Sequence, residues 1–254
     1  ALPIYKRTEA FVNGILQLKS TSFIVHPNFL LLNVNGIYNP ETRRQNYLGM
    51  PQSSEKNTRE GYDASATFLQ KRNVNLTLNL SNYTSLQSTD NLSRVKDKTK
   101  YYGGVFSYRN KFLPFSVSFN RQMADQQTLE TSREFKLDQK MIQVNSSKSF
   151  GRNDHHSFSY LHTENISDQM DALYTKPLHQ NNQLNVFELS DDFTFGAKRG
   201  VTYASGLSSG NESGSYNYRN ISVQQNLAFR LPYRFGWNNS FNYRFTKQDS
   251  MSIE

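Results

Sequence analysis

The sequence predicts an all-β protein, namely an antiparallel up-and-down transmembrane β-barrel of about 12 strands that can also be part of a larger barrel. Two observations lead to this prediction. Long segments alternate between apolar and polar residues, as in a β-strand, because successive side chains of a strand point to opposite faces. The mean hydropathy is only −0.72, yet 13% of the 254 residues are aromatic. A membrane barrel explains both values, since only every second residue of its strands faces lipid.

Residues 221–231 and 235–245 show the alternation most clearly. In the first segment the odd-numbered positions are apolar, and only Gln225 interrupts them. The connection at 232–234 is short, so the two strands are expected to form one antiparallel hairpin. Each strand has about ten residues, which is longer than is usual in soluble sheets and close to the nine to eleven that cross a bilayer.

The remaining strands are expected to alternate with short turns and long polar loops. Strands are predicted at 12–18, 29–38, 62–69, 74–81, 101–109, 113–121, 137–150, 157–162, 184–195 and 201–207. Short turns are predicted near residues 26, 72, 111, 152, 198 and 232, and long loops at 39–60, 84–100, 122–136, 163–183 and 208–217. We therefore interpret residues 1–254 as a single barrel domain.

Other architectures and enzymatic activity fit the sequence less well. The repeat of about forty residues is also typical of β-propellers. A propeller blade needs four short strands, however, whereas each repeat here supplies two long ones. The chain has no cysteine and no run of about eighteen apolar residues. No phosphate-binding loop, nucleophile elbow or zinc-hydrolase motif is present, so we expect no enzymatic activity, no cofactor and no metal site.

In strand length and in the asymmetry of its loops, nearly the whole chain resembles the Gram-negative outer-membrane β-barrels as a class. The resemblance implies an outer-membrane location, and in the class the N-terminus and the short turns usually lie in the periplasm and the long loops outside. Because the strand order predicted here begins with a short turn, three explanations stay open: an upstream strand is missing, Leu2 to Arg7 is itself part of a strand, or the short turns face outward. One feature departs from the class, whose members commonly finish on a strand that ends in an aromatic residue. Here Met251-Ser252-Ile253-Glu254 follow the last aromatic residue, Phe245. We therefore expect either a piece of a longer barrel or an atypical closing strand.

The polar positions of the predicted strands are candidates for the lumen wall, and most are neutral hydrogen-bonding residues. The candidate lumen-lining residues are Asn75, Thr77, Asn79, Ser116, Ser118, Asn120, Ser222, Gln224, Asn226, Asn238, Ser240 and Asn242. They either line a wet, weakly selective path or bond to one another and fill a narrow barrel. For a barrel of about twelve strands both outcomes are open.

The predicted short turns are basic, in a chain of formal net charge +8. The candidate basic rim consists of Lys71, Arg72, Arg109, Lys111, Arg152, Lys198, Arg199, Arg230 and Arg234. Because alternate connections of an antiparallel barrel share one rim, these residues are expected to contact anionic lipid head groups or to capture an anionic solute or partner. Ordinary polar turn composition is the other explanation. We expect no nucleic-acid partner, because the basic residues are not interleaved with aromatic residues on one sheet face.

Three further features of the sequence lead to predictions. His155 and His156 are predicted to lie in a solvated turn rather than in a metal site. Asp191 interrupts an apolar series, which is costly against lipid, so we expect a bulge or a rim position there. Aromatic residues near the predicted strand ends suggest interfacial girdles; they are Tyr101, Tyr102, Phe112, Phe150, Tyr160, Tyr203, Tyr218, Tyr233, Phe235 and Trp237.

These features favour a non-enzymatic barrel in contact with the lipid bilayer, acting as a passive channel or as a scaffold or sheath for a partner protein. Such a partner, for example a multihaem cytochrome, would be another chain, because this one lacks cysteines for haem attachment. The alternative is a soluble secreted or cell-surface β-protein that binds carbohydrate or protein through long loops. That alternative predicts a core made by the same apolar faces.

Overall fold

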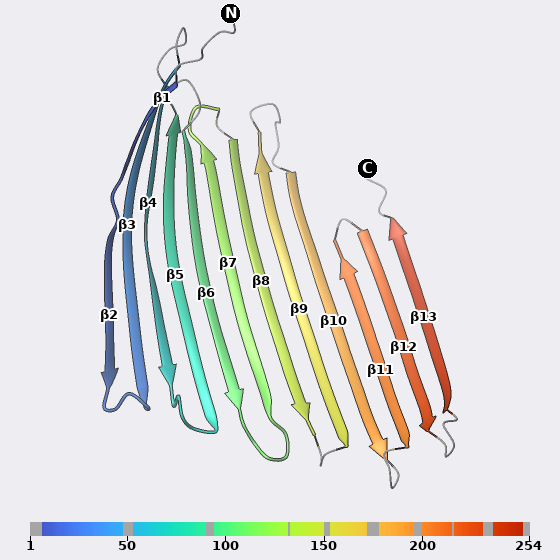
Figure 1. Ribbon diagram of the computed structural model, residues 1–254. Coiled ribbons are helices and arrows are strands. Elements are labelled where there is room, and N and C mark those ends of the chain that lie inside the picture. Colours follow the sequence, from blue (N-terminus) through green and yellow to red (C-terminus); the bar gives the residue numbers. More distant parts are fainter. Residues whose placement is uncertain are drawn as a thin grey trace, which may run out of the picture.

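The computed structural model describes residues 7–47, 53–89, 94–131, 133–149, 153–171, 178–195, 200–214, 216–230 and 236–250. These residues form one antiparallel sheet of thirteen strands (Figure 1). The strands are β1 (Arg7–Asn13), β2 (Leu16–Ile24), β3 (Leu30–Tyr47), β4 (Ser53–Phe68), β5 (Val74–Thr89), β6 (Val95–Tyr108), β7 (Phe115–Thr128), β8 (Arg133–Lys148), β9 (Asp154–Met170), β10 (Leu178–Phe195), β11 (Val201–Ser213), β12 (Tyr216–Arg230) and β13 (Gly236–Ser250). In this part of the chain no helix is long and apolar enough to cross a membrane.

The sheet is a meander in which each strand from β3 to β13 pairs with the next strand of the chain. β2 and β13 therefore lie at opposite edges of the sheet (Figure 1). Such local antiparallel pairing needs only short connections, and the predicted turns near residues 26, 72 and 111 are found. The turns predicted near 152, 198 and 232 fall largely on residues outside the described ranges.

β1 and β2 lie end to end along β3 and form one row of the sheet. Both pair with β3 in the same continuous register, and the break between them lies opposite Asn39 and Pro40. Proline has no N–H to donate, so the regular ladder is interrupted there, although the Gly14 N–H still bonds to the Pro40 carbonyl at 3.0 Å. The thirteen strands thus occupy twelve rows, and the predicted antiparallel fold of about twelve strands is confirmed.

The five predicted long loops are largely strand, so those predictions are wrong. β3 continues to Tyr47 and β4 begins at Ser53, so most of 39–60 is strand, and the other four segments behave in the same way. The alternation of apolar and polar residues disappears there because both faces carry polar residues. The backbone ladder continues nevertheless, since its hydrogen bonds do not require apolar side chains.

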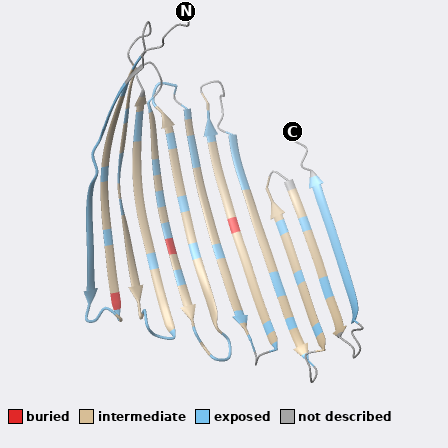
Figure 2. Ribbon diagram, in the orientation of Figure 1, coloured by how far each residue is buried: buried red, intermediate tan, exposed pale blue. Residues whose placement is uncertain are grey.

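The sheet is a single layer without a protein core. Among the described residues only Leu30, Gly103 and Thr163 are buried, and the exposure of Leu30 and of Thr163 is 8% (Figure 2). Large apolar side chains remain uncovered on the sheet, including Leu78 at 45% and Phe241 at 56% exposure. Because no second layer packs on either face within the described ranges, the apolar face needs a partner outside the sheet.

The neighbouring strand leaves no space for a side chain at Gly61 of β4. It lies directly opposite Tyr83 of β5, and a Cβ atom on Gly61 would overlap the Asn82 carbonyl oxygen and the Tyr83 ring. Gly206 of β11 offers a matched contrast, because a Cβ atom there would meet nothing within 4 Å.

We expect Gly61→Ala to lower the free energy of unfolding by about 1–3 kcal/mol, because the overlap is with backbone atoms that cannot move independently. Gly206→Ala is the control and should change it by no more than about 0.5 kcal/mol. Urea unfolding in lipid vesicles, followed by the fluorescence of the single tryptophan, Trp237, measures both values. Equal effects of the two substitutions would contradict the close packing at Gly61.

Candidate membrane-facing surface and lumen wall

The register divides the sheet into two chemically different faces, because direct partners in an antiparallel ladder share a face. We call the face that carries Leu76, Leu78 and Leu80 the outer face, and the opposite one, with Asn75 and Thr77, the polar face. The apolar band consists of the outward-facing residues of 30–38, 62–68, 74–80, 102–108, 115–119, 142–146, 156–162, 187–195, 201–207, 221–229 and 237–245.

The apolar band is five to nine residues long, and on four strands it reaches the length that crosses a bilayer. It covers nine residues of β3 (30–38), of β10 (187–195), of β12 (221–229) and of β13 (237–245). A tilted membrane strand needs about nine to eleven residues to cross the hydrocarbon layer. The band begins at the short turns and stops well before the far ends of the strands, so the rest of each strand extends beyond it.

Charged residues limit the apolar band on the outer face. The first charged outward residues beyond the band are Glu60, Lys100, Arg121, Lys140, Glu164, Arg219 and Lys247. Two of them are tied to carboxylates, since Arg121 bonds to Asp138 at 2.7 Å and Lys140 bonds to Glu164 at 2.8 Å. The change from apolar to ionised groups within one residue pair is typical of the boundary between lipid and water.

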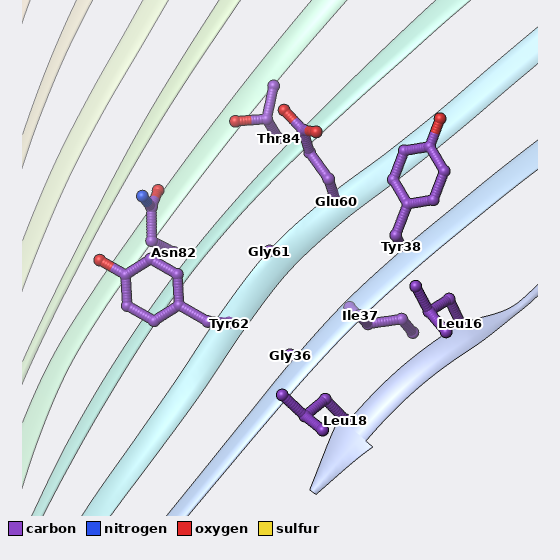
Figure 3. A pocket seen from close by; sticks show the side chains of 10 residues that line it. All are labelled: Leu16, Leu18, Gly36, Ile37, Tyr38, Glu60, Gly61, Tyr62, Asn82 and Thr84. Atoms are coloured by element: carbon purple, nitrogen blue, oxygen red, sulfur yellow. The ribbon is translucent and has the colours of Figure 1, made fainter.

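A shallow hollow on the outer face shows this boundary in detail (Figure 3). Gly36 has no side chain and lies between Leu18 and Tyr62, its direct partners on the neighbouring strands. Glu60 and Asn82 line the same hollow. Apolar, phenolic and charged groups thus succeed one another along the strands, an order that suits tyrosine at the membrane interface.

The described residues of the predicted aromatic girdle divide between the two faces, and the girdle itself stays a prediction. Tyr102, Tyr160, Tyr203 and Trp237 lie on the outer face, and Trp237 stacks on Phe229 with ring centroids 5.3 Å apart. Tyr101 and Tyr218 lie on the polar face, because each alternates with an outward neighbour. Phe112 lies in the turn between β6 and β7, and Phe150, Tyr233 and Phe235 are outside the described residues.

All twelve predicted lumen residues lie on the polar face. The structure brings those of β12 and β13 together, with Gln224 opposite Asn242 and Asn226 opposite Ser240. The groups on β5 and β7 are separated by β6. Three of the twelve make cross-strand bonds: Thr77 to Thr67 at 3.5 Å, Asn120 to Tyr101 at 2.5 Å and Ser222 to Ser208 at 2.7 Å. Their role in a lumen stays a prediction.

The polar face also carries a network that sequence reasoning missed. Asn35 donates to the Asp63 carboxylate at 3.0 Å and accepts from Gln17 at 3.0 Å, and the Tyr83 hydroxyl donates to the same carboxylate at 2.7 Å. The Arg59 guanidinium lies 4.9 Å from the centroid of the Tyr83 ring. The alternation at 62–69 places Asp63 on the polar face, but only the register identifies partners on three neighbouring strands. The bonds satisfy a carboxylate that faces away from the apolar band.

We expect Tyr83→Phe to lower the free energy of unfolding by about 1–2 kcal/mol, because it removes a hydrogen bond to a carboxylate. Tyr62→Phe is the control. Its hydroxyl has no hydrogen-bond partner in the described part of the chain, so the change should stay within about 0.5 kcal/mol. Urea unfolding in vesicles compares the two variants, and an unchanged value for Tyr83→Phe would show that the bond contributes no net stability.

The basic residues of the short turns lie at one end of the sheet as far as they are described. Lys71 and Arg72 follow β4, and Arg109 and Lys111 follow β6; all four are exposed. Arg230 is the last residue of β12, at the same end. Arg152, Lys198, Arg199 and Arg234 are outside the described ranges. Contact of this basic rim with anionic groups stays a prediction.

At the opposite end, a bidentate ion pair ties the entry of β6 to the exit of β7. The Glu130 carboxylate accepts from the backbone N–H of Arg94 at 2.5 Å and from its guanidinium at 2.8 Å. These bonds, that to the guanidinium foremost, lower the pKa of Glu130. The carboxylate is therefore ionised at neutral pH and can accept both bonds from Arg94.

The predictions for the histidines and for Asp191 need correction. His155 and His156 lie in β9 rather than in a turn, on opposite faces. His156 contacts the Asp191 carboxylate at 2.7 Å on the outer face, and His155 contacts Ser149 at 3.1 Å. Asp191 is in regular register with both neighbouring strands, so the predicted bulge is wrong; the predicted rim position does not hold on β10 either, where Phe193 and Phe195 lie between Asp191 and the strand end. The described residues contain no group of three or more ligands for a metal ion.

The fold defined by these two faces is that of an outer-membrane β-barrel wall, and known structures share it. The outer membrane transporter YddB from Escherichia coli superimposes with a TM-score of 0.51 and 10% sequence identity, over 87% of this chain and 38% of that chain. The predicted barrel class is thus confirmed at the level of the fold.

Two receptors give weaker superpositions. The alcaligin outer membrane receptor FauA from Bordetella pertussis matches with a TM-score of 0.46 and 9% identity, over 98% of this chain and 55% of that chain. The ferric preacinetobactin receptor BauA from Acinetobacter baumannii matches with 0.46 and 11%, over 88% and 46%. This chain therefore spans about half the length of these structures or less. No family model and no curated protein matches the sequence.

Proposed function

We propose that this chain forms part of the wall of a wide outer-membrane barrel that transports a solute along its polar inner face. The observation that carries the proposal is the division of one single-layer sheet into an apolar band across eleven strands and a continuous polar face. Lipid covers the first face and water, or a protein inside the barrel, covers the second. No catalytic group is needed for this function.

The uncovered apolar face supports a membrane location over the soluble alternative. A soluble β-protein of this composition would bury the same side chains against a second layer. Within the described ranges they remain open, as Phe119 does at 43% exposure and Tyr243 at 51%. An apolar surface that runs across eleven strands is far larger than the patches of a few hundred Å² that soluble monomers tolerate.

The open edges of the sheet support a barrel wider than these twelve rows. β2 and β13 each pair on one side only within the described part of the chain. Unpaired backbone groups are not tolerated in lipid, so both edges need partners, and in this proposal further strands supply them. Barrels of about sixteen or more strands leave an aqueous channel or hold a plug. The likeness to a much longer outer membrane transporter agrees with this size.

A sheath for a partner protein is the second form of this proposal, and a multihaem cytochrome in the lumen stays a prediction from the sequence. The neutral residues of the polar face suit either water or a protein surface. What separates the two forms is whether the polar face is wet.

We expect the native protein to stay in the membrane fraction after high-salt and carbonate washes and to leave it only with detergent, because its outer face requires lipid. Immunoblots of the wash fractions measure this. A peripheral outer-membrane protein serves as the control for complete washing. Release of this protein by carbonate would contradict the proposed function and favour the soluble surface-binding alternative.

Adjacent cysteines on β7 test which face is wet. Because the chain has no native cysteine, Ser118→Cys and Val117→Cys each introduce a single thiol on the polar and the outer face, respectively. In intact membranes a charged thiol reagent should label Ser118→Cys at least tenfold faster than Val117→Cys. Mass spectrometry measures the labelled fraction. Equally slow labelling would contradict a water-filled path and favour the sheath, whereas equally fast labelling would contradict a lipid-facing outer face.

A further inference from the structure

Polar residues of four neighbouring strands form one row on the outer face. His156 of β9 lies directly opposite Asp191 of β10, Asp191 opposite Ser205 of β11, and Ser205 opposite Gln225 of β12. We call these four residues the polar row. Asn239 of β13 continues it diagonally, because its outward neighbour Phe241 pairs with Gln225.

The polar row crosses the apolar band at mid-height on β10 and β12. Phe193 and Phe195 lie between Asp191 and the short turns, and Phe187 and Leu189 lie on its other side. Gln225 likewise has two apolar outward residues toward the short turn, at 227 and 229, and two on its other side, at 221 and 223. On β10 and β12 the row therefore lies where lipid tails would cover an outer face, whereas on β9 His156 is the last residue of the band before the charged outward residue Asp154.

Lipid tails offer no hydrogen-bond partners to the side chains of the polar row. Within the described part of the chain the side chains of Ser205 and Gln225 have no hydrogen-bond partner, and Gln225 is exposed. One oxygen of Asp191 is bound by His156 at 2.7 Å, while the carboxylate remains 29% exposed. Ionisable groups in a membrane segment almost always face protein or water rather than lipid. A carboxylate, an amide and a hydroxyl in consecutive strands at one level indicate a protein contact.

The polar row carries both hydrogen-bond donors and acceptors, so it is complementary to a second copy of itself. The Gln225 amide and the Ser205 hydroxyl each donate and accept, and the negative charge of Asp191 is accompanied by His156 and by Lys148, the direct partner of His156 on β8. An anionic lipid would be repelled by Asp191, and a strongly basic partner would leave the amide and hydroxyl unsatisfied. A surface with the same mixture of donors and acceptors fits best.

We propose that the polar row is an interface at which a second copy of this chain docks within the membrane, side by side through their outer faces. The inference rests on the proposed function, since only a barrel with its outer face in lipid needs such a cover. Two copies present the same patch to one another, as in the twofold contacts of most homodimers. The exposed rings and aliphatic groups beside the row, such as Leu189, Leu207 and Phe241, supply the apolar part of the contact.

Cysteine cross-linking in native membranes tests this interface. Ser205→Cys introduces a single thiol into this cysteine-free sequence, at the centre of the row. The control is Leu78→Cys, in the apolar band of β5 and 45% exposed, remote from the row along the sheet. After a short bis-maleimide is added to carbonate-washed membranes, Ser205→Cys should give a product of twice the protein mass in at least tenfold higher yield than Leu78→Cys.

A second substitution checks the hydrogen bonds themselves. Added to Ser205→Cys, Gln225→Leu makes the outer face more apolar and should lower the cross-linked fraction severalfold, whereas a lipid-facing row predicts no change. Equal yields for Ser205→Cys and Leu78→Cys, or products only with other proteins, would overturn the second-copy interface. Loss of the protein in the carbonate wash would instead overturn the proposed function, so the two failures are distinguishable.

Discussion

The constraint on which this structure depends is that a single-layer sheet must find different solvents for its two faces while every backbone group within the membrane stays paired. The antiparallel register keeps the backbone paired on both sides from β3 to β12. The register also decides which side chains face which solvent, because a shift of one residue on any strand would exchange its inward and outward side chains. Register, rather than a buried core, is therefore what makes this sequence specify one arrangement.

Side-chain contacts on the polar face support the register. Gly61 accepts the ring of Tyr83 only because the two are direct partners, and the same alignment brings the Tyr83 hydroxyl to Asp63. A slip of one residue would separate both contacts and turn Asp63 toward lipid, where a carboxylate is costly. Polar bonds on the inner face and apolar exposure on the outer face thus favour the same pairing.

The sequence predicts the strands only where apolar and polar residues alternate. Inside the apolar band, strands such as 74–81 were predictable because one face is apolar and the other polar. Beyond the apolar band both faces are polar. The parts of β3 and β10 that extend past the band therefore carry no periodic signal, and the sequence predicts loops there. The Asp63 network was not predictable, since its members lie on separate strands and only pairing unites them.

Asp191 and Gln225 show what pairing adds to the sequence. Each stands out in its own segment as a polar interruption of an apolar series, and each alone has a local explanation such as a bulge. The regular ladder removes that explanation, and Ser205, inconspicuous in a serine-rich segment, is the residue that connects them. Two independent exceptions that meet in one row are harder to attribute to chance than either one. The apolar band is therefore interrupted over β9 to β12, where the outer face needs protein rather than lipid.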